Sequence, residues 1–163
     1  MRKIVLAVFL VLFSRLAWAE EEIVFHKGLL KHQATAVYEA LQDILISSFE
    51  HYLEAHLKYG ESDIHFEGSF EAADVNLSEK HSDAIFVYAD LPGHCGSGAC
   101  TTHILLKMNG RWTEIGSSFG CYKLVAMDSR SNGLRDILET ECKYSDESRI
   151  KKFNGKTYVD DAK

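Results

Sequence analysis

The chain has 163 residues, with 18 lysines and arginines against 24 aspartates and glutamates, a formal net charge of −6. This length suits one domain behind a short targeting segment. The acidic balance argues against nucleic acid or an anionic membrane surface as a partner, because both need lysine and arginine to neutralise phosphate.

The first nineteen residues have the pattern of a secretory signal peptide. Arg2 and Lys3 give a basic start, Ile4–Phe13 is an apolar run of ten, and Ala17-Trp18-Ala19 is an A-x-A cleavage motif. Ten apolar residues are too few for a bilayer core, which takes about 20. We therefore expect residues 1–19 to be removed, leaving no membrane anchor and one mature domain over residues 20–163. The compact signal favours the bacterial periplasm.

A long helix is expected early in the mature chain. After a lead-in over Glu20–Leu30, apolar residues recur at three- and four-residue steps from about Gln33 to Tyr59. No proline interrupts the pattern, and Gly60 stands where a left-handed residue would end a helix. The pattern predicts one amphipathic helix that needs a sheet to cover its apolar stripe.

The remaining chain has the period of β-strands, and Ala84–Ala89 is a continuous apolar run typical of a central strand. Asn109-Gly110 and Asn154-Gly155 predict hairpin turns, Gly116–Gly120 a flexible link, and Ser129–Gly133 a loop. The fold class we predict is α+β, one long N-terminal amphipathic helix packed on an antiparallel β-meander of about six to eight strands. The expected strands are Ile64–Phe70, Ala73–Leu77, Ala84–Ala89, Ile104–Met108, Arg111–Ile115, Cys121–Asp128, Leu134–Cys142, Arg149–Phe153 and Lys156–Val159.

Four cysteines in an exported domain predict two disulfides, and three pairings are open from the sequence. Cys95 and Cys100 enclose a glycine-rich tetrapeptide that bends sharply enough to bring them together. If residue 128 opposes residue 135 across a six-residue loop, Cys121 opposes Cys142. We therefore expect the pairs Cys95–Cys100 and Cys121–Cys142.

The sequence contains two candidate metal sites, and each has a simpler interpretation as a structural feature. His94, Cys95, Cys100 and His103 offer zinc ligands, but the spacing is not a familiar finger pattern and an oxidising compartment favours the disulfide. The second candidate resembles a calcium loop, although Arg130 stands where a ligand oxygen belongs, so a hairpin turn is preferred. The candidate calcium ligands in this loop are Asp128, Asn132 and Asp136. No cofactor is expected.

Catalytic patterns are sparse. A G-x-S-x-G elbow is absent, and a cysteine nucleophile at Cys95 or Cys100 with a neighbouring histidine would be removed by disulfide pairing. Carboxylates are plentiful, but no pair is singled out by an apolar setting. We expect a protein that is not an enzyme.

Four short patterns in the C-terminal half form a recognisable series: C-G-S-x-x-C at Cys95, N-G-x-W at Asn109, S-N-G-x-R-D at Ser131 and F-N-G-x-x-Y at Phe153. The series resembles a group of small uncharacterised bacterial periplasmic proteins, over about Asp90–Val159. The resemblance implies export and a similar fold.

The predicted function is an exported protein-binding module, such as an inhibitor or immunity-type protein against a cell-wall-cutting enzyme. Small size, export, disulfides and an acidic surface favour another periplasmic or exported protein as the partner. The alternatives are a small periplasmic hydrolase using histidine and carboxylate groups, and an envelope structural or stress protein without a specific ligand. The expected contact loop is Pro92–Thr102, and the candidate binding residues are Pro92, His94, Ser97 and His103.

Overall fold

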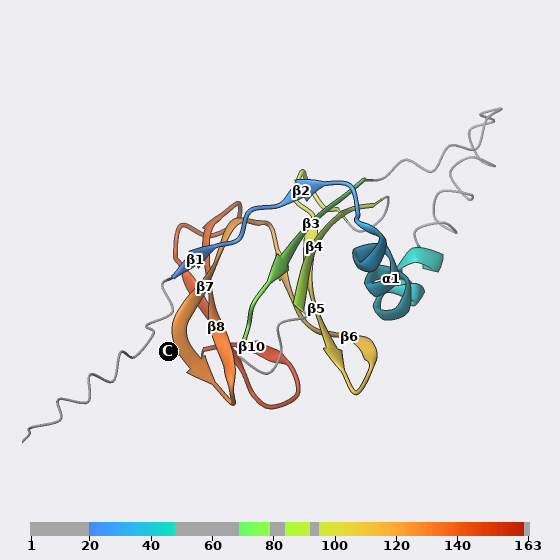
Figure 1. The fold of residues 1–163 in the computed structure, drawn as a ribbon. Helices are drawn as coiled ribbons and strands as arrows, with labels where there is room; N and C mark the ends of the chain where they lie inside the picture. The colour runs from blue at the N-terminus through green and yellow to red at the C-terminus, as the bar shows by residue number, and fades with distance from the viewer. Residues whose placement is uncertain (1–19, 48–68, 79–83, 92–94, 162–163) are drawn as a thin grey trace, which may run out of the picture.

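Two antiparallel five-stranded sheets make up most of the computed structural model, which describes residues 20–47, 69–78, 84–91 and 95–161 (Figure 1). The predicted signal peptide lies outside these ranges. Sheet A runs in the order β1 (Glu21–Glu22), β7 (Cys121–Ser131), β8 (Leu134–Cys142), β9 (Arg149–Phe153) and β10 (Tyr158–Asp160). Sheet B runs in the order β2 (His26–Lys27), β3 (Ser69–Val75), β4 (Ala84–Asp90), β5 (Thr101–Met108) and β6 (Arg111–Phe119).

The core has two layers, one on each face of sheet B. Between the sheets, Phe86 and Ile104 of sheet B pack in one cluster with Leu124 and Ile137 of sheet A. On the other face, Val87 of β4 packs with residues of α1 (Lys31–Ala40), which lies against sheet B alone (Figure 1). The apolar run of β4 is therefore buried on both faces, as the sequence predicted.

The prediction of an α+β fold with one long N-terminal helix is wrong, because the described residues are mostly β. α1 ends at Ala40, where Leu41 leaves helical geometry with φ −118° and ψ 22°. Leu41 is 1% exposed and lies in the cluster under sheet B, where Ile44 and Leu45 also pack. The apolar stripe is real, but a bend follows the twisted sheet better than a straight rod. The predicted end at Tyr59 lies outside the described residues.

The predicted flexible link over Gly116–Gly120 is also wrong, because β6 continues to Phe119 and pairs with β5 as far as Thr101. Only Gly120, with φ +71°, carries the chain from sheet B to sheet A. A Cβ at this position would lie 3.3 Å from the Ala99 Cβ and 3.4 Å from the Tyr144 ring. Both the backbone angle and the crowding require glycine here.

The β7–β8 hairpin reaches the predicted cysteine pairing by a different path. Its turn is the two-residue Asn132-Gly133, with φ +48° and +87°, and not a six-residue loop. That turn alone would set Cys121 opposite residue 144. A bulge between Ala126 and Arg130 adds two residues to β7, so Cys121 faces Cys142.

The other two Asn-Gly pairs differ from each other. Asn109 and Gly110 both have positive φ, +52° and +82°, and connect β5 to β6 as predicted. The last hairpin instead has a four-residue turn, in which the Asn154 N–H donates to the Thr157 carbonyl at 3.0 Å. The Asn154 side-chain oxygen accepts the N–H groups of Lys156 and Thr157, each at 2.9 Å, so β10 begins only at Tyr158.

Candidate functional site

Both disulfides form as predicted and lie at one end of the sandwich, which we call the disulfide end. Cys95 is bonded to Cys100 and Cys121 to Cys142. Gly120 connects the two pairs, because its N–H donates to the Cys100 carbonyl at 3.1 Å and its carbonyl accepts the Lys143 N–H at 2.8 Å. Two disulfides are compatible with an exported protein.

The Cys95–Cys100 loop is a tight reversal held by its own backbone. The N–H of Gly96 donates to the Ala99 carbonyl and the N–H of Ala99 to the Gly96 carbonyl, both at 2.8 Å. Ser97 and Gly98 take positive φ at the tip and are exposed. Ser97 is therefore surface-accessible, as expected of a binding residue.

Of the other three predicted binding residues, the structure describes only His103. Pro92 and His94 lie outside the described residues. His103 is a central residue of β5 and is 4% exposed, so it is not part of the loop surface.

The turn after β8 packs against this loop and fixes its position. The Tyr144 hydroxyl donates to the Gly96 carbonyl at 3.0 Å, and the Lys143 ammonium donates to the Ser97 carbonyl. Phe119, at the end of β6, stacks on Tyr144 with ring planes 2° apart and centroids at 5.9 Å. The turn after β8, itself packed against Phe119 of β6, therefore fixes the position of the loop.

Large aromatic side chains are exposed at this end. Phe119 is 44% exposed, and Tyr144 and Tyr122 are each 57% exposed. Tyr122 follows Cys121 directly on β7. Tyrosine and phenylalanine are enriched in protein interfaces, where they bury much area at little cost in conformational entropy. We name Phe119, Tyr122, Tyr144 and the tip Gly96–Gly98 the aromatic surface.

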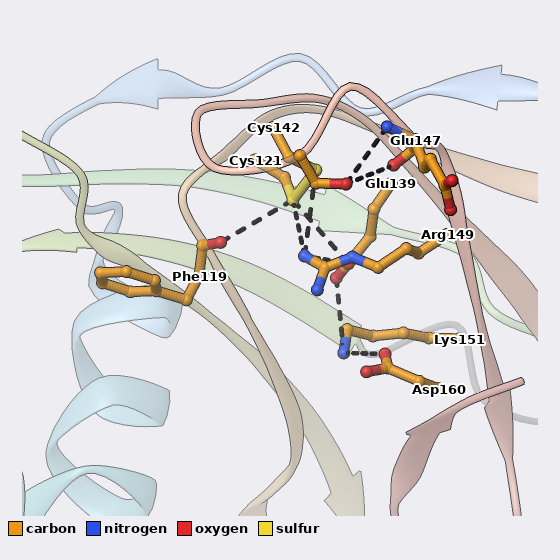
Figure 2. A network of polar contacts seen from close by, with 9 residues as sticks. Phe119, Cys121, Glu139, Cys142, Glu147, Arg149, Lys151 and Asp160 are labelled. Carbon is orange, nitrogen blue, oxygen red and sulfur yellow. Dashed lines mark hydrogen bonds and ion pairs between the residues drawn. A yellow bond between two sulfur atoms is a disulfide. The ribbon is translucent and has the colours of Figure 1, made fainter. Parts of the chain in front are cut away.

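An ionic cluster centred on a buried glutamate lies beneath the Cys121–Cys142 disulfide (Figure 2). Glu139 of β8 is fully buried, and its two carboxylate oxygens face Arg149 Nη2 at 3.3 Å and Lys151 Nζ at 3.5 Å. Lys151 also binds Asp160 of β10 at 2.7 Å. This hydrogen bond lowers the pKa of Asp160. Two acids and two bases balance, so the cluster joins β8, β9 and β10 without a net charge.

The two disulfides differ in their charged neighbours, because the sulfur of Cys121 has a guanidinium beside it as well as the Glu139 carboxylate. The Arg149 guanidinium lies 3.4 Å from the sulfur of Cys121 and 4.0 Å from that of Cys142 (Figure 2). At the other disulfide the neighbour is the exposed carboxylate of Asp90, the last residue of β4.

His103 forms a pair with a carboxylate on the next strand. Its Nδ1 lies 2.7 Å from Glu114 Oε1, while its Nε2 is buried without a hydrogen-bond partner. Ser117 of β6, which is exposed, stands directly opposite His103 in the strand register. A serine, a histidine and a carboxylate on neighbouring strands are the residue types of nucleophilic catalysis.

The calcium candidates are engaged in the hairpin itself. Asp136 is buried and accepts the Ser129 hydroxyl at 2.7 Å, and the Asn132 side-chain amide donates to the Phe153 carbonyl at 2.7 Å. Asp128 is exposed in the bulge. These contacts favour a structural turn in which Asn132 ties β8 to the end of β9.

Sequence reasoning overlooked the aromatic surface and the ionic cluster. The burial of Glu139 could have been predicted from the sequence. Ile137 lies two residues earlier on the same strand face, so the alternation of a strand places Glu139 inward as well. The stacking of Phe119 on Tyr144 joins residues 25 apart through a crossover that the sequence indicated only as a flexible link.

Comparisons with family models, curated proteins and solved structures gave no match for this chain. Within the described ranges, no helix has the length and apolar character needed to cross a bilayer.

Proposed function

We propose that this chain is an exported protein-binding module whose contact surface is the aromatic surface at the disulfide end. The supporting observation is the stack of Phe119 on Tyr144, exposed to solvent yet fixed to a disulfide-closed loop. A preorganised aromatic surface loses little conformational freedom on binding. Interface hot spots are rich in aromatic residues for the same reason.

The partner we propose is a basic exported protein, with a cell-wall-cutting enzyme as the leading class. Removal of residues 1–19 would leave 15 basic and 24 acidic side chains, a net charge of −9. Opposite charge speeds encounter between proteins, and the effect weakens as salt screens it. In this role the protein blocks the enzyme as an inhibitor or immunity-type protein in the periplasm.

The test is inhibition of wall-cutting activity in an envelope extract, measured as release of soluble fragments from purified cell walls. The wild-type protein should lower the activity, more strongly at low salt, whereas Phe119→Ala/Tyr144→Ala should have little effect. Tyr38→Ala is the matched control, because Tyr38 is exposed on α1 and lies outside the aromatic surface. Equal inhibition by the wild type and the double variant would refute the assignment of the surface.

A second candidate function is a hydrolase, favoured by the pairing of His103 with Glu114 opposite Ser117. The burial of His103 weighs against it, because a general base must reach its substrate. A fluorophosphonate probe distinguishes the two functions. Labelling of Ser117 that is lost in His103→Ala would establish the hydrolase, and an unlabelled Ser117 would leave the binding module as the function.

A further inference from the structure

The Asp90 carboxylate is placed against the two sulfurs of the Cys95–Cys100 disulfide. Its Oδ1 lies 3.3 Å from Cys95 Sγ and 3.6 Å from Cys100 Sγ. Sulfurs in a disulfide carry no proton, so neither contact is a hydrogen bond in the oxidised protein. Within the described residues, no cation or N–H donor contacts this carboxylate. Among the described residues, the oxidised loop therefore offers Asp90 no hydrogen-bond donor or cation.

These separations match a metal site better than an oxidised loop. With zinc–sulfur bonds of about 2.3 Å and zinc–oxygen bonds of about 2.1 Å, tetrahedral geometry sets ligand sulfur and oxygen about 3.6 Å apart. The three ligand atoms of Asp90, Cys95 and Cys100 all lie within 4.8 Å of one another. Opening the disulfide would let the two sulfurs separate to the distance that two thiolates on one metal adopt.

A second cluster provides a contrast within the same molecule. Cys121, Glu139 and Cys142 also bring a carboxylate and two sulfurs within 4.8 Å. There the carboxylate is already paired with Arg149 and Lys151, and the guanidinium contacts the sulfur of Cys121. A divalent cation would be repelled by both side chains. The ionic cluster therefore excludes a metal where Asp90 admits one.

We propose that the reduced form of the Cys95–Cys100 loop is a site for a thiophilic divalent cation such as Zn²⁺, with Asp90 as the third protein ligand. A dithiol reductant supplies two electrons and two protons, leaves as its own disulfide, and gives Cys95 and Cys100 as thiols. The metal then displaces both thiol protons, and water completes the tetrahedral site. This site differs from the zinc candidate that the sequence analysis set aside in favour of the disulfide, because His103 pairs with Glu114.

The proposed metal site is hydrogen-bonded to residues that position the aromatic surface. Gly96, inside the loop, accepts the Tyr144 hydroxyl through its carbonyl, and the carbonyl of Cys100 accepts the Gly120 N–H. Holding the two cysteines on one metal preserves the closed loop in the absence of the disulfide. The inference itself does not depend on the proposed function, since metal binding is measured directly.

The experiment titrates Co²⁺ and Cd²⁺ into the full chain after reduction with a dithiol and removal of the reductant, and follows thiolate-to-metal absorption. We expect one equivalent to bind the reduced protein and none the oxidised protein. Adding Zn²⁺ should raise the melting temperature of the reduced protein, because binding to the folded state stabilises it. No thiolate absorption in the reduced wild type would overturn the proposal.

Variants distinguish a built site from random thiol binding. Asp90→Asn should weaken Cd²⁺ binding by roughly tenfold or more. Loss of a residue that only hydrogen-bonds to a metal ligand already lowers metal affinity ~10-fold to ~100-fold, and Asp90 is proposed as a ligand itself. Asp146→Asn, an exposed acid on the loop after β8, should have no effect. Cys95→Ala/Cys100→Ala should abolish binding and Cys121→Ala/Cys142→Ala should retain it. Metal binding that is retained in Cys95→Ala/Cys100→Ala would overturn the proposal. An affinity that is unchanged in Asp90→Asn would also overturn it, because an unfolded chain with free thiols would behave in that way.

Discussion

The two disulfides lie on either side of Gly120 but differ in loop length, contacts and neighbouring charge. Cys121–Cys142 links directly opposed residues of two central strands of sheet A above a balanced ionic cluster centred on a buried glutamate. Cys95–Cys100 closes a short exposed turn beside the Asp90 carboxylate, which contacts no cation among the described residues. The first is built into the sheet, whereas the second shapes a surface. With the function proposed above, the Cys121–Cys142 disulfide would serve stability and the Cys95–Cys100 disulfide recognition.

One of the two largest expected effects on stability is at the ionic cluster. Glu139→Gln removes the buried carboxylate, but Arg149 is 41% exposed and Lys151 keeps its pair with Asp160, so the free energy of unfolding should fall by about 3 kcal/mol, the low end for a broken buried pair. Urea denaturation followed by circular dichroism measures the change. The control is Glu141→Gln on the same strand, where the side chain is exposed and we expect less than about 0.5 kcal/mol. Similar losses in both variants would show that burial of Glu139 does not matter.

Removing the disulfides separately should rank them. Cys121→Ala/Cys142→Ala opens a loop with a sequence separation of 21, and the entropy of the unfolded chain predicts a loss of about 3 kcal/mol. Cys95→Ala/Cys100→Ala opens a separation of only 5, and we expect about 2 kcal/mol. Denaturation midpoints and slopes of both variants check the order. A larger loss from the shorter loop would contradict the division between the sheet disulfide and the surface disulfide.

Gly120, between the disulfides, can be tested against a glycine of similar backbone angle. Gly120→Ala forces a side chain to positive φ and into contact with Ala99 and Tyr144, which should cost about 2 kcal/mol. Gly110 has φ +82°, but a Cβ added there would meet no atom within 4 Å, so Gly110→Ala should cost only the backbone strain of about 1 kcal/mol. Thermal unfolding of both variants measures the difference. Equal losses would mean that packing around Gly120 adds nothing.

The smallest predicted effect is on acid stability. The hydrogen bond from Lys151 lowers the folded-state pKa of Asp160, so its contribution is complete above the unfolded pKa of about 4 and is lost as pH falls through the folded value. Asp160 is largely exposed, so solvent screening limits the contribution to about 0.5 kcal/mol. Asp160→Asn should therefore remove a small part of the acid-induced loss below about pH 4. Unfolding curves at neutral and acid pH measure it, and an unchanged acid limb would contradict it.

Local signals were sufficient where a single strand or turn decided the outcome. The apolar run at Ala84–Ala89 predicted a strand buried on both faces, and Asn109-Gly110 predicted its turn. The facing cysteines at 121 and 142 were predicted for an incorrect reason, since a short turn and a bulge together reproduce the register of a longer loop. The expectation that four cysteines in an exported domain form two disulfides limited the possible pairings, whereas the predicted loop length was incorrect.

Long-range packing accounts for the rest. Leu41, which follows the last residue of α1, is buried under sheet B, and the spacing of apolar residues gave no sign that the helix ends there. Two-residue strands such as β1 and β2 exist only through pairing with distant partners, so no pattern within them indicates a strand. The stack of Phe119 on Tyr144 likewise depends on how the sheets meet.

The most direct test of the division between stability and recognition measures both properties in two variants. For Phe119→Ala/Tyr144→Ala, we predict at least about a tenfold loss of affinity for the exported enzyme that we propose as the partner, equivalent to about 1.4 kcal/mol, and little loss of folding stability. For Glu139→Gln, we predict the reverse, provided that the assay temperature keeps the protein folded. Unchanged affinity in the double aromatic variant, or an affinity that simply follows stability in both, would contradict the account.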